Sequence, residues 1–210
     1  TEEGTIANAF PVEPTVSIKE FELEGDLVEI TNNFNKTGKL SPFENTGLLF
    51  KGKVYTTKTS PLYDGERTVL GDILQNGEVT LEYFIDEKDK DKWAYLKGAK
   101  KEKRKTKEGF EYNYSEGGMI YPDALDNASR TIITGEGGKS PSRFKHVVVS
   151  DRGLRRLTPV ELERLNMFPD NHTKLEGVSD TKRAFFMGNA LVVGVIEKIG
   201  EELNKQINQV

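Results

Sequence analysis

The sequence predicts a mixed α+β fold, with a β-rich central part and a helical C-terminal part. Three observations support this prediction: a hairpin pattern near residue 50, a β-rich run over residues 144–150, and a helix-capping box at residues 158–161. In the box, Thr158 and Glu161 satisfy free backbone amides, and Pro159 suits the first helical position. At 210 residues, the chain is long enough to bury a core without covalent cross-links.

The first part of the chain gives the weaker signals. Residues 1–16 are polar and contain two prolines, which predicts a tail or linker. We expect a short helix within residues 17–34, interrupted by glycine and asparagine. Residues 48–57 predict a β-hairpin with Gly52 in its turn. A β-rich region therefore follows a linker.

The middle of the chain is highly charged. Residues 86–107 begin as a helix anchored by Trp93 and end in a dense run of basic residues from Lys97 to Lys107. Such a run is suited to non-specific phosphate contacts, and a solvated loop explains it equally well. Further along, Phe144 to Ser150 predicts a strand.

The C-terminal part predicts three helices. The first begins at Pro159 and ends before Pro169, and the second begins near Ser179. The third covers residues 190–207 and has one apolar face. That face consists of Leu191, Val192, Val195, Ile196, Ile199, Leu203 and Ile207. We expect it to be buried, because leaving such side chains in water costs roughly 1.5–3 kcal/mol each.

Composition excludes several classes of function. The chain has no cysteine, so it forms no disulfide or zinc–thiolate site and supplies no thiolate nucleophile. With two histidines, we expect no metal site. No apolar run approaches the length of a membrane span, and the N-terminus lacks the layout of a signal peptide. We therefore expect a cytoplasmic protein.

Charge is unevenly distributed along the chain. Residues 1–87 carry 7 basic and 16 acidic side chains, whereas residues 88–210 carry 23 basic and 18 acidic ones. Nucleic acid would bind the second part, because phosphate contacts need lysine and arginine on one surface. A solvated face on an ordinary domain is the alternative.

Three motifs make the prediction more specific. Residues 155–170 read Arg-Arg-Leu-Thr-Pro-Val-Glu-Leu-Glu-Arg-Leu-Asn-Met-Phe-Pro-Asp, residues 188–190 read Gly-Asn-Ala, and residues 129–134 read Ser-Arg-Thr-Ile-Ile-Thr. Their order and spacing resemble the end of the bacterial DNA cytosine-5 methyltransferases. In that family R-x-L-T-P-x-E-x-x-R-L-x-G-F-P-D is followed by Gly-Asn-Ala or Gly-Asn-Ser at the head of the last helix, and a variable target-recognition region precedes both. The resemblance is close over residues 125–210 and loose over residues 40–125.

The sequence departs from the family pattern at several points. Met167 stands where the family has glycine, which disfavours a left-handed turn and predicts an altered helix end. Phe186 replaces a frequent glutamine. The family's earlier motifs, including its Pro-Cys nucleophile and its Glu-Asn-Val base motif, do not occur in the sequence. Residues 9–14 resemble the stretch after the last of those motifs, so we expect the chain to begin where the main catalytic block ends.

The resemblance implies a function. In the family reaction a cytosine is flipped out of duplex DNA, a cysteine thiolate adds to its C6, and C5 takes a methyl group from S-adenosylmethionine. Lacking cysteine, this chain is expected to be inactive without a catalytic half, located in the same longer chain or in a separate subunit. The resemblance thus implies the DNA-recognition and cofactor-pocket-completing part of a restriction–modification methyltransferase, encoded by a bacterium or a phage.

The resemblance also implies a division into domains. Residues 1–16 would link to the catalytic domain, and residues 17–175 would form a small target-recognition domain. Residues 176–210 would form C-terminal helices that complete an α/β S-adenosylmethionine-dependent methyltransferase domain. We expect the last helix to dock on the catalytic half, on a second copy of the chain, or on the body of its own chain.

The residues expected to contact double-stranded DNA lie in the third motif and in the glycine-rich segment after it. Glycines let backbone amides approach phosphate closely, and short hydroxyl side chains donate hydrogen bonds. The expected residues are Arg130, Thr131, Thr134, Gly135, Gly137, Gly138, Lys139, Ser142, Arg143 and Lys145. A glycine-rich surface loop between two strands is the alternative.

Two further groups of residues follow from the resemblance. Asn189 and Ala190 are expected beside the methionine end of S-adenosylmethionine, although Asn189 would also serve as a helix N-cap. An architectural role is expected for Arg155, Thr158, Glu161 and Arg164, through the helix cap and through arginine contacts with carboxylates or carbonyls.

Two other functions fit the sequence. The chain is alternatively a non-enzymatic DNA-binding remnant, which restored methylation on mixing with a catalytic fragment would exclude. It is alternatively a protein-interaction module, which the absence of salt-dependent DNA binding would favour.

Overall fold

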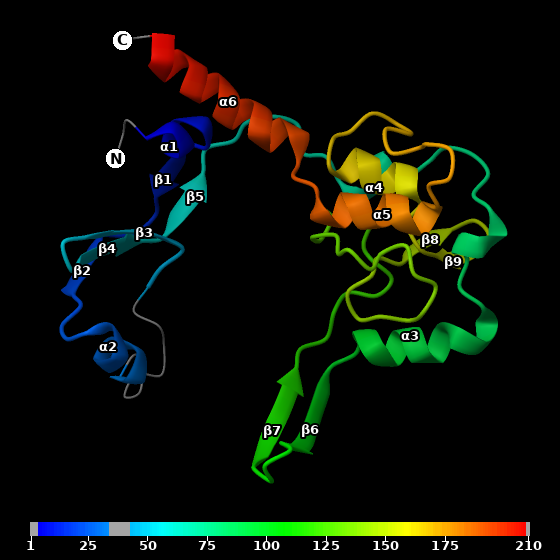
Figure 1. Cartoon of the computed structure of the whole chain (residues 1–210), viewed down its shortest axis with the longest axis horizontal. Helices are drawn as coiled ribbons and strands as arrows, with labels where there is room; N and C mark the ends of the chain where they lie inside the picture. The colour runs from blue at the N-terminus through cyan, green and yellow to red at the C-terminus, as the bar shows by residue number, and fades with distance from the viewer. Residues whose placement is uncertain (1–3, 34–42, 209–210) are drawn as a thin grey trace. The chain divides into compact units, whose positions relative to one another are not determined.

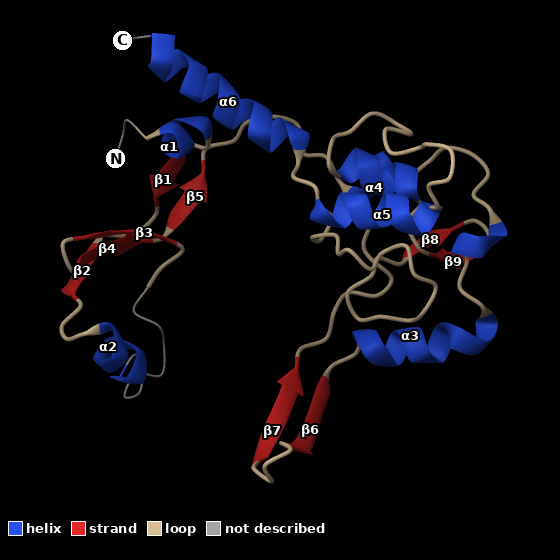
Figure 2. Cartoon of the chain, viewed as in Figure 1, coloured by secondary structure: helices blue, strands red, loops and turns tan. Residues whose placement is uncertain are grey.

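The computed structural model describes residues 4–33 and 43–208 (Figure 1). Helices and short strands are joined by long loops, which is the mixed α+β fold that the sequence predicts (Figure 2). Contacts divide the chain into two compact units, a first unit of Thr1–Gly65 with Lys198–Val210 and a second unit of Glu66–Glu197. No helix of the described residues is long and apolar enough to cross a membrane.

The first unit is built on small antiparallel sheets. Its elements are α1 (Thr5–Ala9), β1 (Val12–Pro14), β2 (Lys19–Glu22), α2 (Leu27–Asn33), β3 (Thr46–Phe50), β4 (Lys53–Thr57) and β5 (Thr59–Pro61). Strand β4 lies between β2 and β3, and β1 pairs with β5. The predicted hairpin is confirmed as β3–β4. Lys51 and Gly52 between them both have positive φ, the geometry of a tight type I′ turn.

Of two further expectations for the first unit, one is wrong and one is confirmed. Residues 4–14 are not a tail, because α1 precedes the prolines and β1 pairs with β5 from Val12 to Pro14. The short helix expected within residues 17–34 is confirmed as α2, which spans Leu27–Asn33, and strand β2 at Lys19–Glu22 precedes it. Gly25, with φ 96°, forms a turn between β2 and α2.

The second unit contains most of the chain's helices. Its elements are 3-10 helices at Leu70–Ile73, Leu81–Tyr83 and Glu87–Asp89, then α3 (Lys90–Lys97), β6 (Lys100–Lys105), β7 (Glu111–Glu116), β8 (Val148–Ser150), β9 (Gly153–Arg155), α4 (Pro159–Leu165), α5 (Asp180–Asn189) and the first turn of α6 (Val193–Asn208). Strands β6 and β7 form an antiparallel hairpin, and so do β8 and β9. The predicted starts of α4 and α5 are confirmed.

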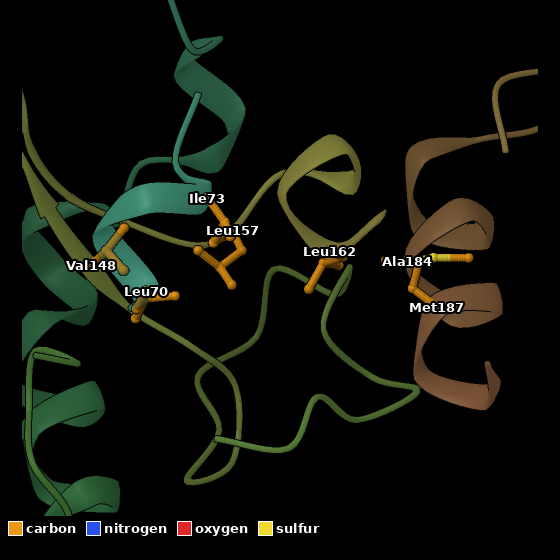
Figure 3. Packing of buried hydrophobic residues seen from close by; sticks show 7 residues of the cluster. All are labelled: Leu70, Ile73, Val148, Leu157, Leu162, Ala184 and Met187. Atoms are coloured by element: carbon orange, nitrogen blue, oxygen red, sulfur yellow. The ribbon is translucent and has the colours of Figure 1, made fainter. Parts of the chain in front are cut away.

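A small hydrophobic cluster packs the second unit together. Its buried members are Leu70, Ile73, Val148, Leu157, Leu162, Ala184 and Met187 (Figure 3). They come from the first 3-10 helix, β8, the segment before α4, α4 itself and α5. Because α5 shares this cluster with α4, the expected boundary at residue 175 does not separate two compact units. The functional division into domains stays a prediction.

Titratable side chains are also buried in the second unit. Eight residues of the second unit are each at most 6% exposed, and we call them the polar interior: Lys97, Glu136, His146, Arg155, Arg156, Glu161, Glu163 and Arg183. Charged groups are rarely buried so completely unless they are paired and hydrogen-bonded. The contacts of the polar interior therefore determine how the second unit is held.

The strand expected over residues 144–150 is shorter than predicted. Only Val148–Ser150 belongs to β8. The preceding amides donate to side chains instead: Val147 N–H to Asp123 Oδ2 at 2.8 Å, and His146 N–H to Glu136 Oε2 at 3.0 Å. Long-range carboxylates take the place of a neighbouring strand here.

The Gly-Asn-Ala motif also lies differently from expectation. It ends α5 instead of opening the last helix. Ala190 is extended, with φ −81° and ψ 161°, and α6 begins only at Val193. An N-cap role for Asn189 is therefore wrong, since that residue is the last of α5.

Candidate functional site

The capping box of α4 includes Glu161, one of the residues of the polar interior. The Thr158 side chain accepts the Glu161 amide at 3.3 Å, and the Thr158 amide donates to Glu161 Oε2 at 2.8 Å. Both nitrogens of the Arg155 guanidinium donate to the same carboxylate, at 2.8 and 2.7 Å. Glu161 is completely buried, so this ion pair is shielded from water. One glutamate thus caps the helix and holds β9 to it.

Arg164, at the other end of α4, makes a more exposed set of contacts. Its guanidinium donates to both oxygens of Asp170 at 2.7 Å, and to the carbonyls of Ile73 and Leu74 at 3.1 and 3.0 Å. The Arg164 guanidinium lowers the pKa of the Asp170 carboxyl. Arg164 therefore connects α4 to the first 3-10 helix and to the loop after α4.

A second buried ion pair joins α4 to α5. Glu163 accepts from Arg183 Nη2 at 3.0 Å, and from the amides of Asn171 and Thr173 at 2.7 and 3.0 Å. Burial raises the pKa of Glu163, but the bonds from Thr173 and Arg183 outweigh it and hold that pKa below its usual range. This pair was not predicted from the sequence. No pattern marks Glu163 as buried, because it lies within a charged segment that also suits an exposed helix.

The helix end at Met167 has a left-handed backbone although the residue is not glycine. Met167 has φ 62°, so it adopts the left-handed turn that glycine would favour, and the expectation of an altered turn is wrong. The amide of Val193 donates to the Asn166 carbonyl at 2.9 Å, which fixes the start of α6 next to this turn. A left-handed conformation costs a non-glycine residue on the order of 1 kcal/mol or more.

Two glycines, Gly188 and Gly137, let α5 approach the third motif and the loop that follows it. A Cβ on Gly188 would lie 2.4 Å from the Thr134 nitrogen and 2.5 Å from the Ile133 carbonyl carbon. A Cβ on Gly137 would lie 2.8 Å from Thr181 Cα of α5. Glycine is needed at both positions for close packing against neighbouring backbone or helix atoms. The structure thus brings the second and third motifs into contact.

Three basic residues expected to contact DNA are engaged inside the chain. Arg130 forms a two-point ion pair with Asp123 at 2.7 and 3.1 Å. Burial raises the pKa of Asp123, but the Arg130 guanidinium and the Val147 amide hold it below its usual range. Lys145 is 7% exposed and donates to the carbonyls of Gly138 and Ser140, both at 2.8 Å.

The third of these residues, Arg143, holds the base of the β6–β7 hairpin. Its guanidinium donates to the carbonyls of Leu96 at 3.1 Å, Gly98 at 3.2 Å and Gly117, and it lies 3.3 Å from a Glu116 oxygen. These groups lie at the end of α3, just before β6 and at the end of β7. Arg143 therefore fixes the direction in which the hairpin leaves the second unit.

The other predicted DNA contacts lie closer to the surface. Thr131, Thr134, Gly135 and Lys139 are exposed, and Lys139 lies 3.8 Å from the exposed Glu82 carboxylate. The half-buried Ser142 accepts the Phe144 amide at 3.3 Å. The loop thus has an exposed rim, while the half-buried Gly137 and Gly138 face α5 and Lys145.

A buried histidine connects this loop to the interior. His146 Nδ1 lies 2.9 Å from Glu136 Oε1, and its Nε2 lies 3.1 Å from Ser129 Oγ. Nearby, the Lys97 ammonium donates to the Lys145 carbonyl. Burial, and then the Arg130 guanidinium, lower the pKa of Lys97 to about 8. Lys97 therefore does not belong to a surface basic run, contrary to the expectation for residues 97–107.

The Gly-Asn-Ala motif presents its last two residues at the end of α5. The exposed Asn189 side chain donates to the Phe185 carbonyl at 2.9 Å, and Ala190 is half-buried. Phe185 and Phe186 beside them are 43% and 38% exposed. Among the described residues, no group of three or more acidic or histidine side chains is placed to hold a metal ion.

Comparison with known proteins identifies the family of the chain. The model of the C-5 cytosine-specific DNA methylases matches residues 23–205. The chain belongs to this family. It is 40% identical over 205 residues to the type II methyltransferase M.Sau3AI of Staphylococcus aureus, covering 96% of the chain but 47% of that relative. The chain thus spans about half the length of this methylase.

Solved methyltransferase structures align with lower similarity. The Entamoeba histolytica methyltransferase EhMeth aligns over 97% of the chain and 56% of its own, with TM-score 0.48. The S. pombe Dnmt2 methyltransferase aligns over 91% of the chain and 58% of its own, with TM-score 0.49. Each is 14% identical to this chain.

Proposed function

We propose that this chain is the DNA-recognition and cofactor-pocket-completing part of a DNA cytosine-5 methyltransferase of the restriction–modification type. The observation that carries the proposal is the family match over most of a chain that contains no cysteine. Methylation at cytosine C5 needs a covalent nucleophile to make the ring carbon reactive, and in the family that nucleophile is a thiolate. A catalytic half, on the same longer chain or on a second one, must supply it.

In this proposal the loop of residues 130–145 has two layers with different tasks. The exposed rim of Thr131, Thr134, Gly135 and Lys139 contacts DNA through hydroxyls, backbone amides and one ammonium. Beneath it, Arg130, Gly137, Gly138, Arg143 and Lys145 hold the rim in place through internal contacts. Base readout needs a fixed register on the duplex, and a braced loop provides it.

The residues present also fit one wall of a cofactor site. Asn189 offers an exposed carboxamide, and Ala190 is small enough to permit close approach. S-adenosylmethionine, when bound, supplies the methyl group that the reaction transfers. The part of this chain would be to hold the end of α5 next to it, through Gly188 on the Ile133–Thr134 backbone. The remaining walls belong to the catalytic half.

The exposed apolar face of α6 is an argument for a binding partner. No residue of α6 is buried, and Ile196, Leu203 and Ile207 are 47%, 48% and 64% exposed. Covering a side chain of this kind contributes roughly 1.5–3 kcal/mol. We assign this face to docking on the catalytic half.

Methyl transfer from tritiated S-adenosylmethionine to mixed-sequence DNA tests the proposal. The chain is assayed alone and with a family catalytic half that contains the cysteine motif. We expect activity in the mixture alone, lost when Ile196→Asn and Leu203→Asn are combined and retained in the neighbouring polar-face variant Glu197→Asn. Activity of the chain by itself, or none in a mixture whose two parts associate, would overturn it.

A further inference from the structure

The β6–β7 hairpin separates its side chains into two chemically different faces. Residues directly opposite in an antiparallel pair point to the same side of the ribbon. Lys101, Lys103 and Lys105 are opposite Ser115, Asn113 and Glu111 on one side, which we call the lysine face. Lys100, Glu102 and Arg104 are opposite Glu116, Tyr114 and Tyr112 on the other, which we call the tyrosine face.

The charges of the tyrosine face are satisfied internally. Arg104 pairs with Glu102 at 3.1 Å and lies over the Tyr114 ring, 3.4 Å from its centroid. Lys100 pairs with Glu116 at 3.3 Å. Within the hairpin two cations thus meet two carboxylates, so the residues of this face carry no net charge of their own to offer a ligand.

The lysine face has excess positive charge. Within the described parts of the chain, Lys101 and Lys103 form no ion pair, and Lys105 lies 3.8 Å from Glu111. All three lysines are exposed. Charges that served only to prevent strand association would not need to be gathered on one face. Three cations against one carboxylate indicate an anionic partner.

The spacing of these lysines suits a nucleic-acid backbone. Alternate residues of a strand are about 6.6 Å apart, so the three lysines extend over about 13 Å. One strand of duplex DNA presents a phosphate about every 3.4 Å along its axis, so this length covers about four phosphates. A two-stranded ribbon is also narrow enough to enter the major groove.

The hairpin is rooted firmly enough to direct this face. Arg143 binds carbonyls on both sides of its base, and the Met119 amide donates to the Lys97 carbonyl at 2.9 Å. The turn is closed by Thr106 and Phe110, with Thr106 N–H donating to the Phe110 carbonyl at 2.9 Å. Figure 1 shows β6 and β7 extending away from the rest of the second unit.

We propose that the lysine face of the β6–β7 hairpin binds the sugar–phosphate backbone of duplex DNA, as an arm separate from the loop of residues 130–145. The inference rests on the proposed function, because it assumes that this chain binds DNA. It adds a surface that holds the duplex without reading its sequence. Loss of this surface would weaken binding about equally on all sequences.

Salt-dependent binding of the full chain to a fluorescent mixed-sequence duplex tests this inference. In the triple variant Lys101→Gln, Lys103→Gln, Lys105→Gln, we expect the slope of log affinity against log salt to become shallower by about 3. Lys103→Gln alone should change it by about 1, whereas the opposite-face control Arg104→Gln should leave it unchanged. Because these side chains are exposed, we expect the variants to fold, and thermal melts check this.

The outcomes separate this inference from the proposed function. DNA binding by the parent chain with an unchanged slope in the triple variant would overturn the hairpin arm and leave DNA recognition standing. An equal change in Arg104→Gln and Lys103→Gln would also overturn it, because the two faces would then be equivalent. A parent chain that binds no DNA would remove both proposals.

Discussion

The burial of helices α4 and α6 is the reverse of what their compositions suggest. Helix α4 contains three charged residues among its seven, yet five of the seven are buried, including Glu161 and Glu163. Helix α6 has an apolar stripe along sixteen residues, and none is buried. Burial here follows the partners available within the chain. Glu161 and Glu163 of α4 pair with arginines and accept backbone amides, whereas the apolar side chains of α6 stay at least partly exposed.

The largest expected effect on stability comes from breaking the buried ion pair between Arg155 and Glu161 of α4. Glu161→Gln removes the carboxylate that binds Arg155 at 2.7 and 2.8 Å and leaves a buried guanidinium without a counter-charge. We expect the free energy of unfolding to fall by about 3–5 kcal/mol. Urea unfolding followed by circular dichroism measures it.

The matched control removes the carboxylate that pairs with Arg164, which lies at the other end of the same helix. Asp170→Asn removes an ion pair with Arg164 whose carboxylate is 47% exposed, and no measurable loss of stability is expected. If Glu161→Gln were as mild as Asp170→Asn, the polar interior would not hold the second unit together.

The polar interior also predicts a dependence on pH. The pKa of Lys97 is lowered to about 8 in the folded chain from 10.5, so the unfolded chain binds more protons between these values. Stability should therefore rise with pH from about 8 towards 10, by on the order of 3 kcal/mol at most. Above pH 10 the opposite effect sets in, because the pKa of Tyr83 is raised by burial and by Asp180.

Lys97→Met isolates this effect. The variant should be more stable than the parent near pH 7, and the difference should shrink as the pH approaches 10. Chemical unfolding of both proteins at a series of pH values measures it. A constant difference across this range would contradict a depressed pKa for Lys97.

Substitutions at two glycines test the contrast between tight packing in the second unit and the open surface of α6. Gly188→Ala would drive a Cβ into the Ile133–Thr134 backbone and should cost about 1–3 kcal/mol. Gly200→Ala, in α6, meets no atom within 4 Å and should stabilise the helix by about 1 kcal/mol. Thermal unfolding of both variants gives the comparison, and a harmless Gly188→Ala would show that the two motifs are not tightly packed.

The smallest expected effect is at the end of α4. Met167→Gly relieves a left-handed backbone with φ 62° while losing a side chain that is 58% exposed. We expect stability to increase by about 1 kcal/mol. Denaturant midpoints compare the two proteins. A clear loss instead would mean that the contact of Met167 with Gly194 outweighs the backbone strain.

Local sequence signals predicted the elements that depend on local chemistry. The β3–β4 turn, the capping box of α4 and the start of α5 after Ser179 need only neighbouring residues, and all lie where expected. Elements that depend on distant residues were missed. The strand expected from Phe144 is shortened by Asp123 and Glu136, which no local pattern indicates.

The candidate site divides in the same way. The second and third motifs pack together through Gly188, and their role in function stays a prediction. They did not indicate which side chains face inward. Arg130 and Lys145 have the chemistry of phosphate ligands, yet each donates hydrogen bonds to groups within the chain. Only three-dimensional contacts distinguish a basic residue that braces a loop from one that contacts DNA.

Hydrogen exchange of α4 and α6, measured with and without a family catalytic half, tests the account most directly. In the chain alone, α4 amides should be strongly protected and α6 amides should exchange quickly. In a mixture that methylates DNA, α6 should become protected while α4 stays as it was. The claim is that the apolar face of α6 docks on the catalytic half. It would be contradicted if α6 were already protected in the monomeric chain, or still unprotected in an active mixture.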